Sequence, residues 1–538
     1  MSVRVVPAAL LLAACSQSVP ASDDEGAVPA PVSLARCAPA AAPRDFGVLA
    51  EQARSVVGFS PCGDLAWLGE ARDLYRAPPD LGSVLHVSET ATDSAFSADG
   101  RWLGFADDAG VVLVPLDGGE TLRAPLALPR GFGFARVDDT VLPWACDDDA
   151  LRVLDAGAPR ALVEGVDCRS LRPDPASALL VFLDAGGALK AANVGDGVVR
   201  DLGGLEGTAP DSGRQDVRGT RLMDRLPGDL LIVRDSYREP CGDTECPTGP
   251  APVWAIDVGT GAVLTSLSGP LLDDWSEDLM TSRDGRAVVL DVYQGGATLV
   301  DAAHASHGLP GVVPAFVFGD GREVLARRRA EGERSSGFAM VSTTDAAARP
   351  LVDHAEAFGV SADERRLALA HFTPDCILYP DRPGVCHTQI WALATATRGA
   401  GEAPRDVAWF DQPPRVYWIG DDGTMLVGGE LYTRPVPEAA APEEGRPDVY
   451  GLMLLAPDGT LRAALGDESW LQVQAAGERL LLTRRDGQTL SVDVLDPATG
   501  AVAAVVSGQE VELSVADDGL RMAALADGTL WAGAVPTP

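Results

Sequence analysis

The sequence predicts an all-β protein assembled from about 10–11 repeats of short strands. Three observations lead to this fold class: a recurring phrase of apolar strands around an Asp-Gly turn, a second signature that follows it in the same order, and a composition rich in turn-forming residues. The 538 residues are 46% hydrophobic and include 58 glycines and 40 prolines. Frequent turns together with enough apolar material for a core favour many short strands.

The recurring phrase is clearest at residues 96–119, FSADGRWLGFADDAGVVLVPLDGG. An apolar strand ends in Ser-x-Asp-Gly, a second strand follows, and a polar turn leads to a third strand. Asp and Gly tolerate the left-handed backbone that such reversals require. Related phrases begin at Gly58, Leu171, Met280, Phe316, Gly359, Tyr417, Val473 and Leu513, with weaker units around Val137 and Asp229.

A second signature marks the third strand of several units. VWAIDVGTGAV from Val253 and VLDPATGAV from Val494 share Asp-x-x-Thr-Gly-x-Val, and a looser relative begins at Ile390. Together the two signatures resemble the TolB/WD40-like propeller repeat of bacterial exported proteins, from about residue 45 onward. The resemblance implies a β-propeller of four-stranded units, and the spacing of about 36 to 58 residues between equivalent turns agrees with it.

Ten or eleven units exceed the four to eight blades of an ordinary ring, so we expect two tandem propellers or one large ring over residues 41–538. A division into two propellers would fall near residues 303–314. The last unit ends after three strands, at Trp531. We expect residues 46–49 to supply its fourth strand.

The N-terminus reads as an export signal. Residues 1–14 combine Arg4, an apolar run and two alanines, and they are too short to span a bilayer as a helix. The sequence LAAC ending at Cys15 resembles the bacterial lipobox, which implies cleavage before Cys15 and lipid attachment to it. Residues 15–40, rich in Ser, Pro, Ala and acids, are predicted to be a flexible tether. By the same resemblance, Ser16 favours the outer membrane within the cell envelope.

Cysteine usage agrees with export. Without Cys15, eight of the nine cysteines remain, an even number that suggests four disulfides in an oxidising compartment. Sequence neighbours pair as Cys37 with Cys62, Cys146 with Cys168, Cys241 with Cys246, and Cys376 with Cys386, although about 105 connectivities are possible. The absence of a CxxC pair argues against zinc.

The net charge of −35 argues against nucleic acid as a partner, because phosphate backbones would be repelled. The chain has 43 Lys and Arg against 78 Asp and Glu, and Lys190 is its single lysine. Without a polybasic patch, membrane attachment depends on the lipid anchor. Solubility or adaptation to a salty environment is the leading explanation of the acidity, with a surface that binds cations or a cationic partner as the alternative.

The longest insertions fall between the second and third strands of three units, at residues 235–252, 372–389 and 434–448. Two of them hold a proposed local disulfide, and Cys146 and Cys168 belong to the same end of their sheets. Long loops on a rigid scaffold often carry recognition. We therefore expect this end of the sheets to be a binding face, with neutral drift of the insertions as the alternative.

No catalytic residue, cofactor site or metal site is assigned from the sequence. GFSPC at Gly58 lacks the second glycine of a nucleophile elbow. His304 and His307 with Asp301, and Asp147–Asp149, are weak candidates for cation binding because neither has the spacing of an established site. Trp254, Trp391 and Trp531 occupy equivalent third-strand positions, which favours packing between units over a sugar platform.

The sequence thus favours a membrane-anchored lipoprotein that acts as a propeller binding or scaffolding module. An envelope protein, a peptide or a glycan is the expected partner. The alternative is a propeller-type hydrolase or lyase with its site in the central funnel, although no set of acids, His and Arg recurs at first-strand positions. A third interpretation is a structural module of an envelope complex.

Overall fold

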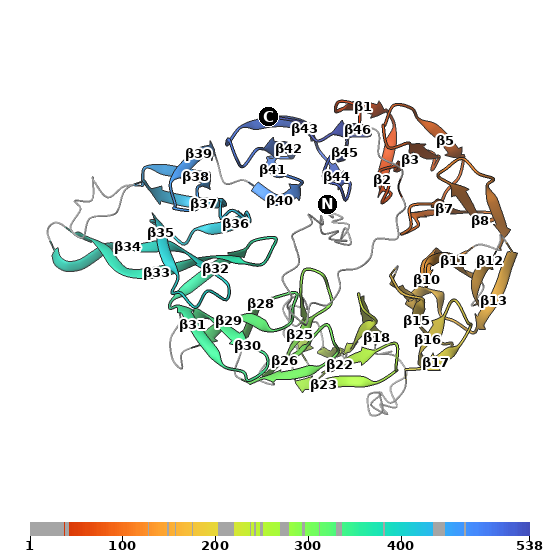
Figure 1. Ribbon diagram of the computed structural model, residues 1–538, viewed down its shortest axis with the longest axis horizontal. Coiled ribbons are helices and arrows are strands. Elements are labelled where there is room, and N and C mark those ends of the chain that lie inside the picture. The colour runs from red at the N-terminus through yellow and green to blue at the C-terminus, as the bar shows by residue number, and fades with distance from the viewer. Residues whose placement is uncertain are drawn as a thin grey trace, which may run out of the picture. The chain divides into compact units, whose positions relative to one another are not determined.

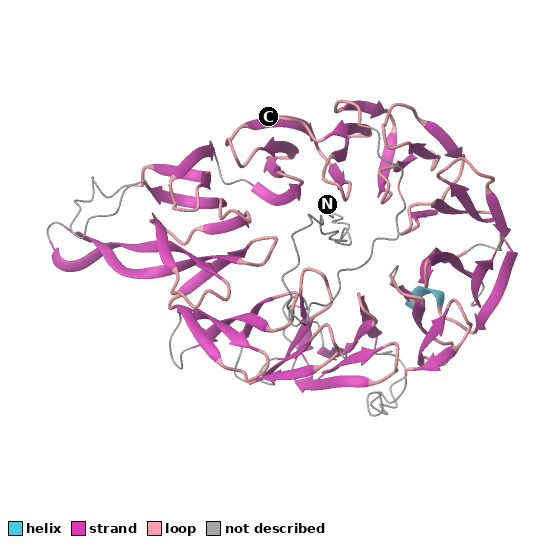
Figure 2. Cartoon of the chain, in the orientation of Figure 1, coloured by secondary structure: helices cyan, strands magenta, loops and turns pink. Residues whose placement is uncertain are grey.

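We describe the protein from a computed structural model. The described residues are 37, 42–126, 129–147, 150–155, 158–174, 176–202, 220–236, 238–241, 244–247, 251–269, 279–292, 296–310, 313–329, 336–379, 382–433, 447–466 and 470–538. In this part of the chain the structure is formed by strands, together with one short 3₁₀ helix, η1 (Cys168–Ser170) (Figure 2). No described helix has the length and apolarity needed to cross a bilayer.

The chain divides into two compact units. Unit 1 comprises Met1–Pro270, Arg283–Arg286 and Glu512–Val535, and unit 2 comprises Leu271–Ser282, Ala287–Val511 and Pro536–Pro538. The prediction of a division near residues 303–314, and the choice between one ring and two, stay predictions.

Unit 1 contains six antiparallel sheets of four strands and one small hairpin (Figure 1). In sheet order they are β1 (Gly47–Ala50), β46 (Thr529–Ala534), β45 (Arg521–Ala526), β44 (Val511–Val515); β2 (Ala53–Phe59), β3 (Leu65–Gly69), β4 (Leu74–Ala77), β5 (Leu85–Ser88); β6 (Asp93–Phe96), β7 (Trp102–Asp107), β8 (Gly110–Pro115), β9 (Leu122–Pro125); β10 (Gly131–Val137), β11 (Thr140–Asp147), β12 (Ala150–Asp155), β13 (Ala158–Glu164); β14 (Arg172–Pro173), β15 (Leu179–Leu183), β16 (Leu189–Asn193), β17 (Val199–Asp201); β18 (Thr220–Leu226), β19 (Leu230–Ser236), β22 (Ala251–Asp257), β23 (Val263–Gly269); and the hairpin β20 (Arg238–Cys241), β21 (Thr244–Pro247).

Unit 2 contains three four-stranded sheets and one sheet of eight strands. The four-stranded sheets are β24 (Leu279–Thr281), β25 (Val288–Val292), β26 (Gly296–Val300), β27 (Ser306–Leu309); β28 (Val313–Val317), β29 (Glu323–Arg329), β30 (Ser336–Ser342), β31 (Ala348–Val352); and β40 (Trp470–Ala476), β41 (Arg479–Asp486), β42 (Thr489–Leu495), β43 (Val502–Gly508). The eight-stranded sheet is β32 (Ala355–Val360), β33 (Arg366–Tyr379), β34 (Arg382–Thr397), β35 (Arg405–Phe410), β36 (Arg415–Ile419), β37 (Met425–Tyr432), β38 (Val449–Leu455) and β39 (Leu461–Gly466).

The eight-stranded sheet is two consecutive repeat units, β32–β35 and β36–β39, joined by a short ladder between β35 and β37. Only Trp409 with Tyr432 and Phe410 with Leu431 pair across that junction. Counting it as two units gives eleven four-stranded units in the described residues, within the predicted range. The all-β propeller fold class is therefore confirmed.

Apolar clusters between consecutive sheets form the core of each unit. In unit 1, Phe105 and Leu74 belong to the cluster between β2–β5 and β6–β9, whereas Phe182 and Trp144 lie between β10–β13 and β14–β17. A sheet that lies between two such clusters buries both faces, because alternate residues of a strand point to opposite sides. Buried aliphatic residues consequently fill the second and third strands, as the repeat phrase predicted.

The two ends of the described chain meet in one sheet. β1 pairs antiparallel with β46, matching Gly47 with Ala532 and Val48 with Trp531, and Phe46 stacks on Trp531 with ring centroids 6.3 Å apart. The backbone N–H of Ala534 donates to the carbonyl of Arg44 at 2.8 Å. The prediction that residues 46–49 supply the fourth strand of the last unit is confirmed.

Candidate binding faces of the repeat

Each sheet has two chemically different ends. We call the end that holds the turns from first to second and from third to fourth strand the AB/CD end. The opposite end, which holds the turns from second to third strand and the links to the next sheet, is the BC/DA end. In unit 1 the described N-terminal attachment lies at the AB/CD end, whereas the described insertion lies at the BC/DA end.

The Ser and Asp of the repeated turn satisfy each other and the backbone. The Ser97 hydroxyl donates to Asp99 Oδ1 at 2.6 Å and accepts the backbone N–H of Trp102 at 2.9 Å. Ser361 donates to Asp363 in the same way at 2.5 Å. These side chains hold the turn that reverses the chain, as expected for Ser and Asp beside a turn glycine. Their contacts are structural, so the recurring Ser-x-Asp-Gly is not a catalytic set.

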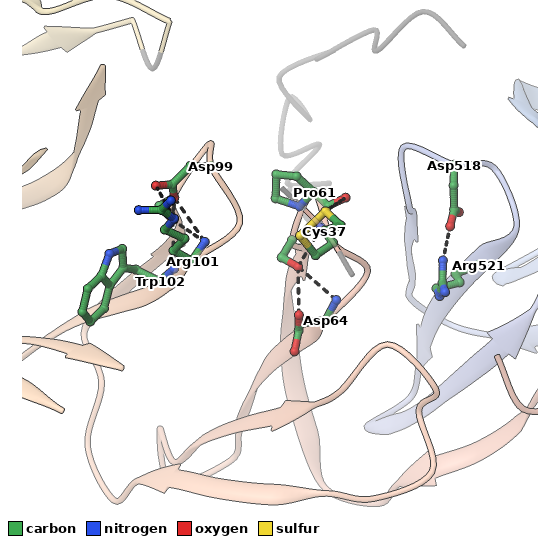
Figure 3. Close-up of a disulfide and its surroundings, with 11 residues drawn as sticks. Cys37, Pro61, Asp64, Asp99, Arg101, Trp102, Asp518 and Arg521 are labelled. Carbon is green, nitrogen blue, oxygen red and sulfur yellow. Dashed lines mark hydrogen bonds and ion pairs between the residues drawn. A yellow bond between two sulfur atoms is a disulfide. The ribbon is translucent and has the colours of Figure 1, made fainter. Parts of the chain in front are cut away.

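The N-terminal segment is fastened at the AB/CD end of unit 1. Cys37 forms a disulfide with Cys62, which lies in the turn between β2 and β3, and its Sγ lies 3.6 Å from the carbonyl oxygen of Pro61 (Figure 3). The backbone N–H of Arg44 then donates to the carbonyl of Asp80 at 3.1 Å, in the turn between β4 and β5. The chain thus enters unit 1 at the AB/CD end before it forms β1.

Neighbouring AB/CD turns are packed tightly around this attachment. A Cβ added to Gly100, which has a φ of +68°, would lie 2.6 Å from Cys62 Sγ, so the position demands glycine. On the other side, Arg521 is 2% exposed, pairs with Asp518 and donates from Nε to the carbonyl of Pro79 at 2.9 Å (Figure 3). A buried guanidinium therefore joins the last sheet to the first.

The BC/DA end of unit 1 carries the second described disulfide. Cys146 at the end of β11 is bonded to Cys168 in η1, and both cysteines are buried between consecutive sheets. Asp167 caps η1 by accepting the backbone N–H of Arg169 at 3.1 Å. The disulfide confirms the predicted pairing and links two sheets that share no hydrogen-bond ladder.

Acidic side chains at this end are paired with bases. Asp107 accepts two hydrogen bonds from Arg123, the shorter at 2.8 Å, and Lys190 lies 3.1 Å from Asp184. The Lys190 hydrogen bond to Asp184 raises the pKa of Lys190 above its usual value. Asp147, the first residue of the weak cation candidate Asp147–Asp149, accepts from Arg152 Nε at 2.5 Å, whereas residues 148–149 lie outside the described part.

The predicted insertions take the form of strand extensions. At residues 235–252 the hairpin β20–β21 rises from the BC end of its sheet, and at 372–389 the long strands β33 and β34 continue as a ladder. Thr373 donates to the carbonyl of Ile390 at 3.0 Å within that ladder. The expectation that both segments are loops is wrong for the described strands, and residues 377–379, Ile-Leu-Tyr, have high strand propensity.

Several predicted residues remain untested. The backbones of Cys241, Cys246, Cys376 and Cys386 lie in these extensions, but their side chains are outside the described part, so the two disulfides stay predictions. Residues 1–36, including Cys15, and residues 434–446 also lie outside it.

His304 and His307, the weak candidates for cation binding, lie in an ordinary turn with Asp301. Asp301 accepts the backbone N–H groups of Ala303 and Ala305, each at 2.9 Å, and its second oxygen lies 2.9 Å from His307 Nε2. His304 has a φ of +62°, and the described part of the chain contains no group of three potential metal ligands. The arrangement stabilises the link between β26 and β27.

The third-strand tryptophans pack as the sequence indicated. Trp254 is buried in the cluster between β14–β17 and the sheet of β18 and β19, and Trp391 packs against the cluster between β32–β35 and β36–β39. Trp531 lies against Phe46. None of these contacts forms an open aromatic platform.

A buried ionic cluster lies between two sheets of unit 1. The Arg225 side chain is 3% exposed and pairs with Asp229, which also accepts from Ser177 at 2.6 Å. Burial raises the pKa of Asp174 nearby and lowers that of Arg225, partly offset by their mutual attraction. Because a cation and two carboxylates share one buried site, this cluster serves to connect sheets.

No family model matches the sequence, and no curated protein matches it. The structure is similar to several solved structures that carry propellers. The β-propeller domain of the Trilobed protease from Pyrococcus furiosus is 9% identical with a TM-score of 0.31, covering 59% of this chain and 94% of that one. Dipeptidyl peptidase 4 from Porphyromonas gingivalis is 9% identical, TM-score 0.34, covering 89% of this chain and 56% of that one.

An oligogalacturonate lyase from Vibrio parahaemolyticus is 13% identical with a TM-score of 0.31, covering 57% of this chain and 79% of that one. At these identities the activities of such proteins do not transfer to this chain. The chain itself is a β-propeller protein with two described disulfides.

Proposed function

We propose that this protein is an exported lipoprotein, tethered to the cell envelope through Cys15, that uses the BC/DA end of its propeller sheets as a binding surface. One observation carries the proposal. In unit 1 the N-terminal chain attaches at the AB/CD end, whereas the inserted hairpin β20–β21 extends from the BC/DA end. The segment that would carry the lipid and the segment that would meet a partner therefore lie at opposite ends.

The length of chain between Cys15 and Cys37 supports this arrangement. About 22 residues separate the two cysteines, and a chain of that length reaches at most about 75 Å. Because the chain enters unit 1 at the disulfide on the AB/CD end, a tether of this length would leave the BC/DA end of unit 1 accessible to a partner. The acidic composition then keeps the protein from lying flat on anionic lipid.

The disulfides add a second line of support. Two of the proposed pairs sit in insertions, and a crosslinked insertion loses less conformational freedom when it binds. The Cys146–Cys168 bond fixes two neighbouring sheets at the same end. We propose that an envelope protein, a peptide or a glycan binds there, and that the protein acts as a scaffold or binding module.

The tether is tested by replacing the cysteine that would be lipidated. We expect the full chain to float with membrane vesicles and Cys15→Ser to remain soluble, and mass spectrometry of the N-terminal peptide to show acylation of Cys15 in the wild type. Equal flotation of both proteins would contradict the tether. Cys37→Ser is the matched control, because it removes a nearby cysteine that would not carry lipid.

The binding surface is tested by crosslinking in intact envelopes. Residues 237–249 are replaced with Gly-Gly-Ser-Gly, and the control carries the same linker inserted after Thr260, in the turn at the other end of the same sheet. Loss of a specific crosslinked partner in the first variant alone supports the proposal. If both variants retain the crosslinked partner and show unchanged circular dichroism, this hairpin is not part of the binding surface.

A further inference from the structure

Unit 2 contains a cavity of about 180 Å³ between two consecutive repeat units, at the AB/CD end of β32–β35 and β36–β39. One wall comes from β33, β34 and the turn that leads to β35, and the other from the turns beside β36 and β38. It is lined by Arg366, Leu367, Thr395, Ala396, Thr397, Glu402, Ala403, Arg405, Ile419, Gly423 and Pro457. Neither the repeat phrase nor any motif in the sequence marks it.

Strand register places four polar side chains in one row. Arg366 pairs with Thr397 across β33 and β34, and Thr395 pairs with Arg405 across β34 and β35. Directly paired residues lie on the same face of an antiparallel sheet, and residues two apart on one strand share that face. The two arginines and two threonines therefore all face the neighbouring repeat unit.

The same face is apolar one step further along each strand. Ala368, Leu393 and Val407 pack in the buried cluster with Ile419 and Met425 of the next unit. The layer between the sheets thus changes from apolar to cationic at its AB/CD end, where the cavity opens. A site with an apolar floor and convergent polar groups is typical of small-molecule recognition.

Neither guanidinium group at the site is neutralised by an ion pair. Arg366 donates from Nε to the carbonyl of Asp421 at 3.0 Å, which fixes its direction, and Arg405 is exposed. Within the described residues neither arginine has a carboxylate oxygen within 4.0 Å. By contrast, Arg398 at the same end lies 2.7 Å from both Asp320 and Glu323.

The charged residues around the cavity favour a ligand that carries a single negative charge. Two arginines against Glu402 leave a lining charge of one positive unit, and Asp422 lies close enough to Arg366 for their charges to interact. A phosphate dianion would be repelled more strongly by Glu402 and Asp422 than a carboxylate, which carries one negative charge. The planar donors of a guanidinium group also match the two oxygens of a carboxylate. Leu367, Ile419 and Pro457 offer apolar surface to a short carbon chain.

We propose that this cavity binds a small monocarboxylate, with Arg366 and Arg405 donating to the carboxylate and Thr395 or Thr397 adding a hydroxyl donor. The free acid of a metabolite and an acidic side chain of a peptide share this chemistry. The proposal is independent of the tether and of the BC/DA surface, because it concerns the opposite end of the sheets in unit 2.

The test is a ligand-observed NMR titration of the purified full chain at 0.15 M NaCl, with propionate as the probe. Propionamide has the same shape without the charge and serves as the ligand control. We expect propionate to show saturating binding and propionamide to bind at least about tenfold more weakly, because a charged acceptor strengthens each hydrogen bond. Equal binding of the two would overturn the proposal. Acetyl-Glu amide as a second probe distinguishes a peptide side chain from a free small acid.

Variants distinguish direct binding by the two arginines of the cavity from a general effect of removing a positive charge. Arg405→Gln and the double change with Arg366→Gln should weaken propionate binding about tenfold and more than tenfold, respectively. Arg415→Gln removes the same charge from an exposed position of unit 2 outside the cavity and should leave binding unchanged. If Arg415→Gln weakens binding as much as Arg405→Gln, or if Arg405→Gln has no effect while thermal melting is unchanged, the assignment is wrong.

Discussion

Removing the disulfide between Cys37 and Cys62 should loosen the last sheet of unit 1. The bond closes a loop with a sequence separation of 25, and that loop contains β1, the fourth strand of the sheet built on β44–β46. Chain entropy for a loop of this length corresponds to about 3.5 kcal/mol at 25 °C. Without the bond, β1 is held by a short ladder with an irregularity between Val48 and Ala50.

The expected result for Cys37→Ser with Cys62→Ser is faster amide exchange in β46, whose outer neighbour is β1. A loss of about 3.5 kcal/mol corresponds to at most about 400-fold more frequent opening. Peptide-resolved hydrogen exchange with mass spectrometry measures this at Leu530–Ala532, while β41 in unit 2 reports any global effect.

The matched control is Cys146→Ser with Cys168→Ser. Its loop has a sequence separation of 22, so the entropy is nearly the same, but the loop holds β12 and β13 instead of β1. If exchange in β46 is unchanged in the Cys37 variant, or rises equally in both variants, the disulfide does not hold β1 in place and the reasoning fails.

Three further predictions concern buried groups. Gly100→Ala places a methyl group against Cys62 Sγ at a positive φ, so we expect a loss of about 1–3 kcal/mol by urea unfolding, and an unchanged midpoint would mean that the disulfide shifts at no cost. Arg521→Met removes a buried guanidinium together with its hydrogen bond to the carbonyl of Pro79, so we expect a loss of about 1–3 kcal/mol by urea unfolding, whereas a gain in stability would show that apolar packing can replace the guanidinium. Burial raises the pKa of Asp493 above its usual 3.8, so the folded state holds its proton more tightly and stability is lost as the pH rises through that range. Asp493→Asn should therefore raise the melting temperature at pH 7 and leave it unchanged at pH 3, and equal shifts at both values would contradict the sign.

The repeat was predictable because each unit places the same chemistry at the same position. Turn residues such as Ser97 and Asp99 make their hydrogen bonds within the turn itself, so a short sequence is enough to recognise them. The pattern of apolar residues along a strand indicates which of its faces are buried. The position of β1 also follows from the sequence, because the last unit has only three strands of its own and needs a fourth. The pairing of Cys37 with Cys62 was predictable from proximity in the sequence, and that of Cys146 with Cys168 also from their position at the same end of consecutive units.

The cavity and the ionic links between sheets were not predictable in the same way. Arg366 and Arg405 are about 40 residues apart and meet only through the register of β33, β34 and β35. Arg521 reaches the carbonyl of Pro79 across most of the chain length. Such contacts depend on which face of which sheet packs against its neighbour, and a one-residue change of register would reverse them.

The position of the described disulfides has a physical reason in the propeller fold. Within a sheet, backbone hydrogen bonds resist separation of strands, but consecutive sheets are held mainly by side-chain packing, with the ladder between β35 and β37 as an exception in the described residues. Cys146 and Cys168 join two sheets where no ladder exists, and the buried Arg521 joins two others. A covalent or charge-assisted link adds most stability at such a boundary, because otherwise only apolar packing holds the two sheets together there. Arg366 and Arg405 lie instead at the boundary between β32–β35 and β36–β39, where the ladder between β35 and β37 already joins the sheets, so these arginines are better explained as a binding site than as a further link between sheets.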